Sequence, residues 1–548
     1  MMTVGQSYFD WELGNPLLKG SPGPLTHLEL GQQLAYDPRA KWGGLLPPQH
    51  QRFGQSYEIK EFFFPQFQHI DAAMRVLAIH TMAMKQLDPR IPMNRAALYD
   101  RGRFKGKELK DIPWFSGGAM GGVLEAITGE GKTIFGDRLC SLFEHQVVHH
   151  VASEEYGWVD FKQLMYLRVF MPAGAGRAGF LLEAAKEMDR LLDTDYATEL
   201  TARGTTIEKQ LVLLLIWLSL HRCGLLIIEE AQDRVIGSID FGSDFLFFFL
   251  KVLNWGIPLL LIGNPSAMKV VRTFSQDRRR LSDGVWCTLE PITFWNSSEW
   301  RDDLVANVWS WTVLPEPDEP IPDLPKYLWS LTGGCRSALA RLRRESLLAA
   351  AFDGALSVSK KHVEAGYRSQ SYIEMHPMIN AFVQKNPKLL EQFIDIPRDH
   401  FAAKWTLERA VQKARDDALK KAAQEKAEDA ARMALEAERL ASADAVAGAS
   451  RTADQSPPVQ ADAPINADQS AAPPARKGRA RTAKAPTFAD EPPVEPPGKP
   501  EAPSDPDDFE QTVDDTTAAI PQPPGPPPAQ PVARFRGLFR APPKEGSN

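Results

Sequence analysis

Cysteine is scarce in this sequence of 548 residues, with only four along the whole chain. Cys140, Cys223, Cys287 and Cys335 are far apart and form no C-x-x-C pair. This spacing argues against a zinc site and against a disulfide framework, and it suits a reducing cytoplasm. A basic excess is also lacking, because the formal charge is −7. We therefore expect any contact with nucleic acid to be a local patch.

Long hydrophobic runs are missing too. The most apolar run, LVLLLIWLSL at 211–220, has ten residues, which is too short to span a bilayer and suits a buried core helix. The opening stretch MMTVGQSYFDWELG has neither the basic nor the apolar region of a signal peptide. We expect a cytoplasmic protein without membrane contact.

Composition divides the chain into successive parts. A helical patch at 67–85 precedes an alternation of apolar strands and amphipathic helices, which is typical of an α/β unit with a parallel sheet. A run rich in Ala, Glu, Lys and Arg then predicts a mostly solvated helix rather than a long coiled coil. The last part holds 22 of the 44 prolines and is predicted to be disordered. The expected parts are an amino-terminal extension (1–110), an α/β core (111–295), a helical part (296–400), a charged helix (401–442) and a proline-rich tail (443–548).

The tail contains one segment of mixed character, RFRGLFR at 534–540, after a proline-rich spacer. Its alternation of arginine with apolar residues is compatible with a solvated tail and with a docking peptide for a partner or nucleic acid.

The stretch AITGEGKT at 126–133 is similar to the phosphate-loop pattern G-x-x-x-x-G-K-[ST], except that Ala126 replaces the first glycine. A strand-like segment precedes it and a helix follows, so backbone N–H groups at the helix start would face phosphates. Lys132 would reach the β- and γ-phosphates, and Thr133 would offer its hydroxyl to Mg²⁺. Positive φ angles are expected at Gly129 and Gly131. The expected nucleotide contacts are Gly129, Glu130, Gly131, Lys132, Thr133 and Ile134.

The second element of the candidate site is the acidic stretch CGLLIIEEAQD at 223–233. Four aliphatic residues and then two carboxylates predict a buried strand that delivers charge at its carboxyl end, where α/β sheets bind ligands. Glu229 would hold Mg²⁺, and Glu230 would polarise the attacking water. Two solvated acids at a strand end are the alternative.

Three further features complete a candidate site. The strand GIPLLLIG ends at Asn264, whose amide could orient the water, although a simple turn is an equally good interpretation. FSQDRRR at 274–280 could supply an arginine across a subunit boundary to stabilise transition-state charge, or be merely solvated. The candidate fingers are Arg278, Arg279 and Arg280. Arg336 opens a helix after a glycine pair, and a cation there opposes the helix dipole and needs an external anion such as phosphate.

The order of these elements resembles that of AAA+ ATPases, and more closely that of the transposition-regulating AAA+ ATPases of bacterial transposons, the TnsC and TniB type. The resemblance covers about 60–350 and also includes FFFPQFQHIDA (62–72), QLMYLRVFMPA (163–173) and LDTDY (192–196). It implies an α/β AAA+ P-loop ATPase with a parallel central sheet and a small helical lid, and an amino-terminal extension that contacts DNA or a target selector.

By the same resemblance, Lys132 and Thr133 match the phosphate-loop pair, Glu229 and Glu230 the acidic pair, and Asn264 and Arg336 the two sensors. Such proteins use ATP and Mg²⁺ to assemble as rings or helical filaments on double-stranded DNA. They bridge a target-selection protein to the transposase, and hydrolysis disassembles them. The departures at Ala126 and Glu229 leave binding intact but imply slow hydrolysis.

The DNA-contacting residues are not identified by a motif. Candidates are RGRFKGKELK at 101–110 and Arg177, with solvated loops as the alternative. Two other functions stay open, a nucleotide-locked scaffold that does not hydrolyse ATP and an AAA+ accessory ATPase of another DNA or secretion system.

Overall fold

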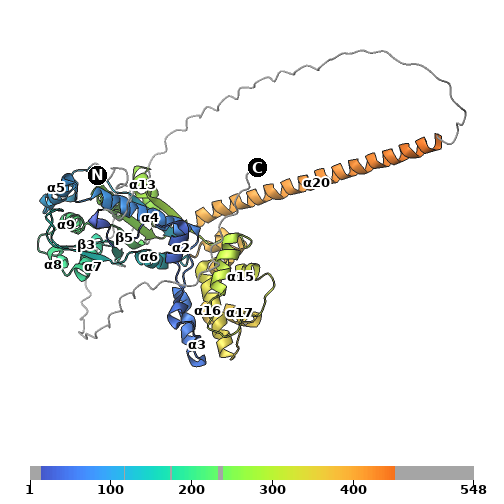
Figure 1. The fold of residues 1–548 in the computed structure, drawn as a ribbon, viewed down its shortest axis with the longest axis horizontal. Helices are drawn as coiled ribbons and strands as arrows, with labels where there is room; N and C mark the ends of the chain where they lie inside the picture. Colours follow the sequence, from blue (N-terminus) through green and yellow to red (C-terminus); the bar gives the residue numbers. More distant parts are fainter. Residues whose placement is uncertain (1–13, 116–117, 173–175, 232–238, 274, 451–548) are drawn as a thin grey trace, which may run out of the picture. The chain divides into compact units, whose positions relative to one another are not determined.

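The computed structural model describes residues 14–115, 118–172, 176–231, 239–273 and 275–450 (Figure 1). Of these, 14–414 belong to one compact unit and 415–450 to a second. None of the described helices combines the length and the apolar character needed to cross a membrane.

A five-stranded parallel sheet forms the centre of the first unit, with the order β4-β5-β6-β1-β7. Its strands are β1 (Gly121–Ala126), β4 (Leu167–Phe170), β5 (Leu226–Ala231), β6 (Leu259–Gly263) and β7 (Val285–Leu289). A separate antiparallel pair is made by β2 (Val147–His150) and β3 (Phe161–Leu164). The central strands are nearly continuous aliphatic runs because helices cover both faces of the sheet.

Alternate residues of each strand face two different helical layers. Val123 of β1 packs in one core with α7 (Arg177–Leu192), α9 (Ile207–Leu220) and α11 (Ile239–Asn254). Its neighbour Leu124 packs in another core with the helices of the opposite layer. These are α2 (His27–Leu34), α4 (Phe67–Gln86) and α6 (Lys132–Cys140). The predicted α/β fold with a parallel central sheet is confirmed.

Two helices follow the sequence predictions closely. The patch at 67–85 is α4, and it places the amino-terminal part of the chain directly on the sheet. The apolar run at 211–220 lies in α9, whose residues Leu211–Ser219 are all buried. Further helices of this region are α3 (Gln49–Gln55), α5 (Pro92–Asp100), α8 (Tyr196–Leu200), α12 (Lys269–Thr273) and α13 (Ser275–Ser282).

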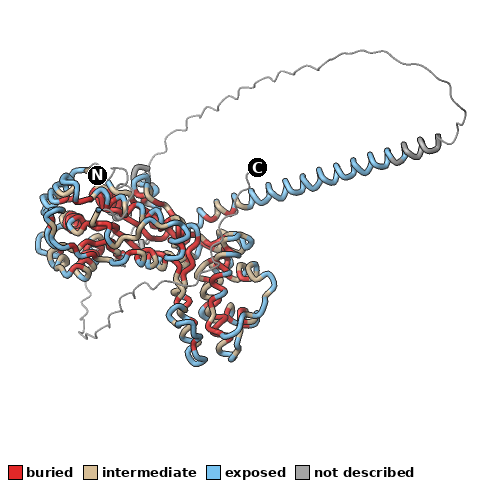
Figure 2. The backbone as a smooth tube through the Cα atoms, viewed as in Figure 1, coloured by how far each residue is buried: buried red, intermediate tan, exposed pale blue. Residues whose placement is uncertain are grey.

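A helical lid follows β7 and has its own core around Trp300, Trp311 and Tyr372. A π-helical segment (Glu299–Val305) leads into α14 (Ala306–Trp309), α15 (Leu324–Thr332), α16 (Arg336–Phe352), α17 (Lys360–Tyr367), α18 (Gln370–Ile373) and α19 (His376–Gln384). In Figure 2 these helices carry red, buried segments between tan and pale-blue ones.

The last helix, α20 (Arg398–Ser450), is longer than the predicted 401–442. It extends into a stretch assigned to the tail because the alanine-rich residues after 442 still favour a helix. Phe401 and Trp405 pack in the lid core, whereas every residue from Arg409 to Leu440 is exposed (Figure 2). The predicted solvated helix is confirmed. The remainder of the predicted tail, from 451 on, lies outside the described residues.

Candidate nucleotide site

The loop between β1 and α6 has the backbone conformation expected of a phosphate loop. Gly129 and Gly131 have φ angles of 93° and 85°, as predicted. A Cβ atom on Gly129 would lie 2.3 Å from Ser337 Oγ, so a side chain at this position would clash as well as strain the backbone. Gly131 is the N-cap of α6, which begins at Lys132, and the backbone N–H groups at a helix start favour an anion.

Ala126, which replaces the usual first glycine, is fully buried at the end of β1. It packs in the core between the sheet and the helices α4 and α6. Its methyl group is thus part of the core of the protein.

Strand register brings the predicted polar groups to one edge of the sheet. Gly263 of β6 pairs with Glu125 of β1 and with Ala231 of β5, so the three strands end at a common level. Glu229 and Asn264 therefore lie at the edge from which the phosphate loop leaves. Asn264 is 8% exposed, and its Oδ1 has no hydrogen-bond partner among the described residues. A buried amide oxygen of this kind is suited to a ligand or a water molecule.

Glu229 is buried and held by a cation that the sequence analysis did not single out. Arg168 of β4 donates from Nε to Glu229 Oε1 over 2.8 Å, and from a second nitrogen to Asp137 Oδ1 over 2.5 Å. A Cβ atom on Gly136 would lie 2.2 Å from Glu229 Oε1, so the carboxylate lies against α6. Burial lowers the pKa of Arg168, but Glu229 outweighs this effect and raises it. The side chain of Glu230 lies outside the described residues.

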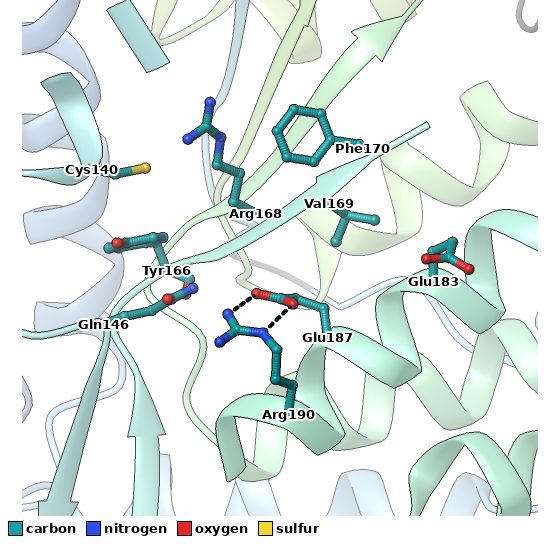
Figure 3. A pocket seen from close by; sticks show the side chains of 9 residues that line it. All are labelled: Cys140, Gln146, Tyr166, Arg168, Val169, Phe170, Glu183, Glu187 and Arg190. Atoms are coloured by element: carbon teal, nitrogen blue, oxygen red, sulfur yellow. Dashed lines mark hydrogen bonds and ion pairs between the residues drawn. The ribbon is translucent and has the colours of Figure 1, made fainter. Parts of the chain in front are cut away.

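A cavity of ≈ 330 Å³ is lined in part by Arg168 (Figure 3). Glu187 and Arg190 of α7 form an ion pair along it, and Cys140 and Tyr166 also line it. None of the predicted site residues lines this cavity, so it adjoins the acidic strand without being the phosphate site.

Arg336 reaches the phosphate loop but already has protein acceptors. It donates to Gln66 Oε1 over 2.6 Å, to Glu130 Oε2 over 2.5 Å and to the carbonyl of Glu290 over 2.9 Å. Glu130 is fully buried, and burial raises its pKa although Arg336 opposes the shift. The expected anion for Arg336 is therefore present, and it is a carboxylate of the loop itself.

Other contacts tie the lid to the same loop. Ser337 N–H donates to the carbonyl of Gly129 over 3.0 Å, and Thr128 Oγ1 donates to Asp395 Oδ2 over 2.6 Å. At the start of α20, His400 and Lys404 both donate to the carboxylate of Glu290. Burial raises the pKa of Glu290, but these two donors outweigh it and lower the pKa to about 2.

The arginine cluster lies on α13, and its three side chains are exposed. Arg278 lies over the ring of Trp286 at 5.9 Å, and Arg280 lies over the ring of Trp114 at 5.3 Å. None of Arg278, Arg279 and Arg280 has an acidic partner within the part of the chain that the structure describes.

The basic candidates for DNA contact are mostly engaged with acids or with the core. Arg101 lies over the ring of Trp255 and donates to Ser219 Oγ. Ion pairs join Arg103 to Asp100, Lys105 to Glu199, Lys110 to Glu108 and Arg177 to Glu208. These pairs reduce the positive charge that 101–110 and Arg177 offer to a phosphate backbone.

No protein-family model and no curated protein matches this chain. Among solved structures, the chain is similar to the ORC1 protein of Aeropyrum pernix in complex with DNA, with 16% identity and a TM-score of 0.31 over 52% of this chain and 66% of that one. It is also similar to the Aeropyrum pernix ORC2 protein in its ADPNP–ADP complexes, with 15% identity and a TM-score of 0.31 over 50% and 67% of the two chains. At these values the case for the site rests on its own geometry. The parallel sheet, the loop after β1 and the helical lid agree with the predicted architecture of a parallel central sheet and a small helical part.

Proposed function

We propose that this chain is an ATP-binding AAA+ protein that assembles as a ring or filament on double-stranded DNA, hydrolyses ATP slowly and regulates transposition in the cytoplasm. The observation that carries the nucleotide part is the convergence of the phosphate loop, Glu229 and Asn264 at one edge of the sheet. The transposition part rests on the resemblance of segments such as 62–72 and 163–173. A target-selection protein and a transposase are the partners that this resemblance implies.

The chemistry assigned to the site follows from the types and positions of its residues. Lys132 and the start of α6 attract the phosphates, and the exposed hydroxyl of Thr133 is available to the metal. ATP supplies the phosphoanhydride bond, and Mg²⁺ neutralises charge on the phosphates. Glu230 polarises the attacking water, and Asn264 orients it. An arginine of α13 from a neighbouring subunit stabilises the charge that develops on the γ-phosphate.

A non-hydrolysing scaffold is the second candidate, and one observation favours it. The carboxylate of Glu229 is 1% exposed and already paired with Arg168. To hold Mg²⁺ it must share its oxygens with, or leave, the partly buried guanidinium group of Arg168. This competition is a physical reason for slow hydrolysis, and in the extreme for none.

The test uses the purified full chain with ATP and duplex DNA, followed by light scattering and negative-stain imaging. Rings or filaments are expected with the wild type and not with Lys132→Ala, which lacks the phosphate-binding cation. A wild type that stays monomeric under these conditions contradicts the proposal.

The Glu230→Gln variant separates the two candidates. If the site hydrolyses ATP, this variant accumulates ATP-bound assemblies that outlast those of the wild type. If the site is a locked scaffold, wild type and variant give assemblies of equal lifetime and neither releases phosphate.

A further inference from the structure

Strand β1, which leads into the phosphate loop, carries an acid among apolar residues. Glu125 is 1% exposed and lies two residues before the loop begins at Ile127. Its Oε1 accepts from Thr288 Oγ1 over 2.6 Å and from Trp286 Nε1 over 3.1 Å, and it also forms an ion pair with Arg272. A buried carboxylate is costly unless it is paired, so the burial of Glu125 depends on these three donors.

Two of the three donors connect Glu125 to the arginine helix α13. Arg272 belongs to α12, the short helix just before α13 in the chain. Its guanidinium carbon lies 5.1 Å from the centre of the Trp286 ring, and that of Arg278 lies 5.9 Å from the same ring. The acid of the phosphate-loop strand, Arg272, Trp286 and a candidate finger are thus in one continuous chain of contacts.

The other end of α13 contacts the beginning of the same strand. A Cβ atom on Gly121 would lie 2.9 Å from the backbone of Leu281 and 3.2 Å from the carbonyl of Arg280. The absence of a side chain at Gly121 allows the helix backbone to touch the strand. Helix α13 is therefore packed on β1 at Gly121, and the preceding helix α12 is joined to the same strand by the ion pair between Arg272 and Glu125.

We propose that Glu125 is a positioning residue that fixes the arginine helix to the phosphate-loop strand, so that each subunit presents Arg278 and Arg279 correctly to the nucleotide of its neighbour. This inference rests on the proposed function, since it needs ATP bound between subunits. Glu125 acts through α13 and contributes to catalysis at the neighbouring site. The nucleotide site of the subunit that carries this Glu125 does not depend on Glu125.

A mixed-subunit ATPase assay tests this inference. Glu125→Gln keeps the size of the side chain and an acceptor for Thr288 and Trp286, but loses the charge that holds Arg272. We expect its affinity for a fluorescent ATP analogue to stay within about twofold of wild type, while ATPase falls about tenfold or more, a barrier change of about 1.4 kcal/mol. Lys132→Ala subunits bind no ATP and do not assemble alone, but they can join an interface whose ATP is held by a Glu125→Gln subunit. Their intact arginine helices should restore hydrolysis at the Glu125→Gln sites. Arg279→Ala mixed in the same way serves as the reference for such a rescue.

Matched variants separate positioning from general destabilisation. Asp318→Asn breaks another buried ion pair, with Arg343 in the lid at 2.6 Å, and should lower stability while leaving ATPase independent of mixing. If it shows the same loss and the same rescue, the inference is wrong. If Glu125→Gln fails to fold, Trp286→Phe removes the indole N–H donor to Glu125 while keeping a smaller aromatic ring, and should give a smaller loss that is rescued in the same way.

The outcomes also separate this inference from the proposed function. An active wild type whose Glu125→Gln variant is not rescued by Lys132→Ala subunits, or has lost its own ATP affinity, contradicts the positioning role alone. A wild type that binds no ATP and releases no phosphate contradicts the proposed function and the positioning role together.

Discussion

The contact between Arg336 and Glu130 should contribute strongly to the stability of the lid on the phosphate loop. The side chain of Arg336 is 11% exposed and that of Glu130 is 0% exposed. Replacing Arg336 by methionine keeps an extended side chain but leaves a buried carboxylate without its cation. Removing one partner of a buried pair typically costs about 3–5 kcal/mol, whereas removing both is often close to neutral. We therefore expect Arg336→Met to lose about 3 kcal/mol or more, and Arg336→Met/Glu130→Gln to recover most of that loss.

The sign of the pH dependence gives a second check on the same variant. Burial already raises the pKa of Glu130, and Arg336 is the group that opposes this shift. A carboxyl group whose folded-state pKa is raised destabilises the protein as the pH rises above its unfolded value of 4.5. The deficit of Arg336→Met should therefore shrink as the pH falls toward that value.

Urea unfolding followed by tryptophan fluorescence is a suitable assay, because Trp300 and Trp311 are buried in the lid core. Arg301→Met is the control, since Arg301 and Asp302 are each 53% exposed and such a pair is worth at most about 1 kcal/mol. If the double-mutant cycle gives a coupling below about 0.5 kcal/mol, Glu130 is not the anion that holds Arg336 and the reasoning is refuted.

Three further predictions concern the same region and the tail. Glu130→Gln removes the loop's own anion, so Arg336 should be freer to bind phosphate and ATP affinity should rise about tenfold. A titration with a fluorescent ATP analogue measures this affinity. A weaker affinity would show that Glu130 stabilises the position of the lid and does not compete with phosphate for Arg336. Glu290 raises the pKa of His400 above 6.5, so this contact stabilises the fold below that pH and its contribution is lost as the pH rises through the raised pKa. Melting temperatures between pH 6 and 8 should therefore fall for wild type and change less for His400→Gln. Parallel curves for the two proteins would contradict this role of His400. Deleting 451–548 should leave ATP binding and assembly intact while weakening recruitment of a partner, and loss of assembly would count against this assignment.

The sequence predicted the elements whose signal is local. The aliphatic strands, the glycine-rich turn with φ > 0 and the fully apolar helix at 211–220 each depend on neighbouring residues, and the structure confirms them. The exposed helix beyond Arg409 was equally readable, because its composition lacks an apolar stripe.

The contacts that define the candidate site could not be predicted from neighbouring residues in the sequence. Arg168 and Glu229 are 61 residues apart, and Arg336 and Glu130 are 206 residues apart, so only the folded chain shows that they pair. A usable signal existed for two groups, since Glu125 and Arg168 are single charges within otherwise apolar strands. Such charges are rarely buried without a partner or a role.

In the basic stretch at 101–110, the folded chain adds contacts that the order of residues does not show. Its lysines and arginines form a cluster in the sequence, but acids from the same segment and from elsewhere in the chain pair with them, Glu199 with Lys105 among them. Charge counted along the sequence therefore overstated the charge that this surface presents.

The central claim is that ATP binding drives assembly on duplex DNA, and nucleotide-dependent DNA binding measures it most directly. Fluorescence anisotropy of a labelled duplex should rise cooperatively with wild-type protein in ATP, stay low in ADP and stay low for Lys132→Ala in either nucleotide. The ATP-dependent binding should weaken with added salt, as expected for contacts to the phosphate backbone. Equal binding in ATP and ADP, or no binding by the wild type, would contradict the account.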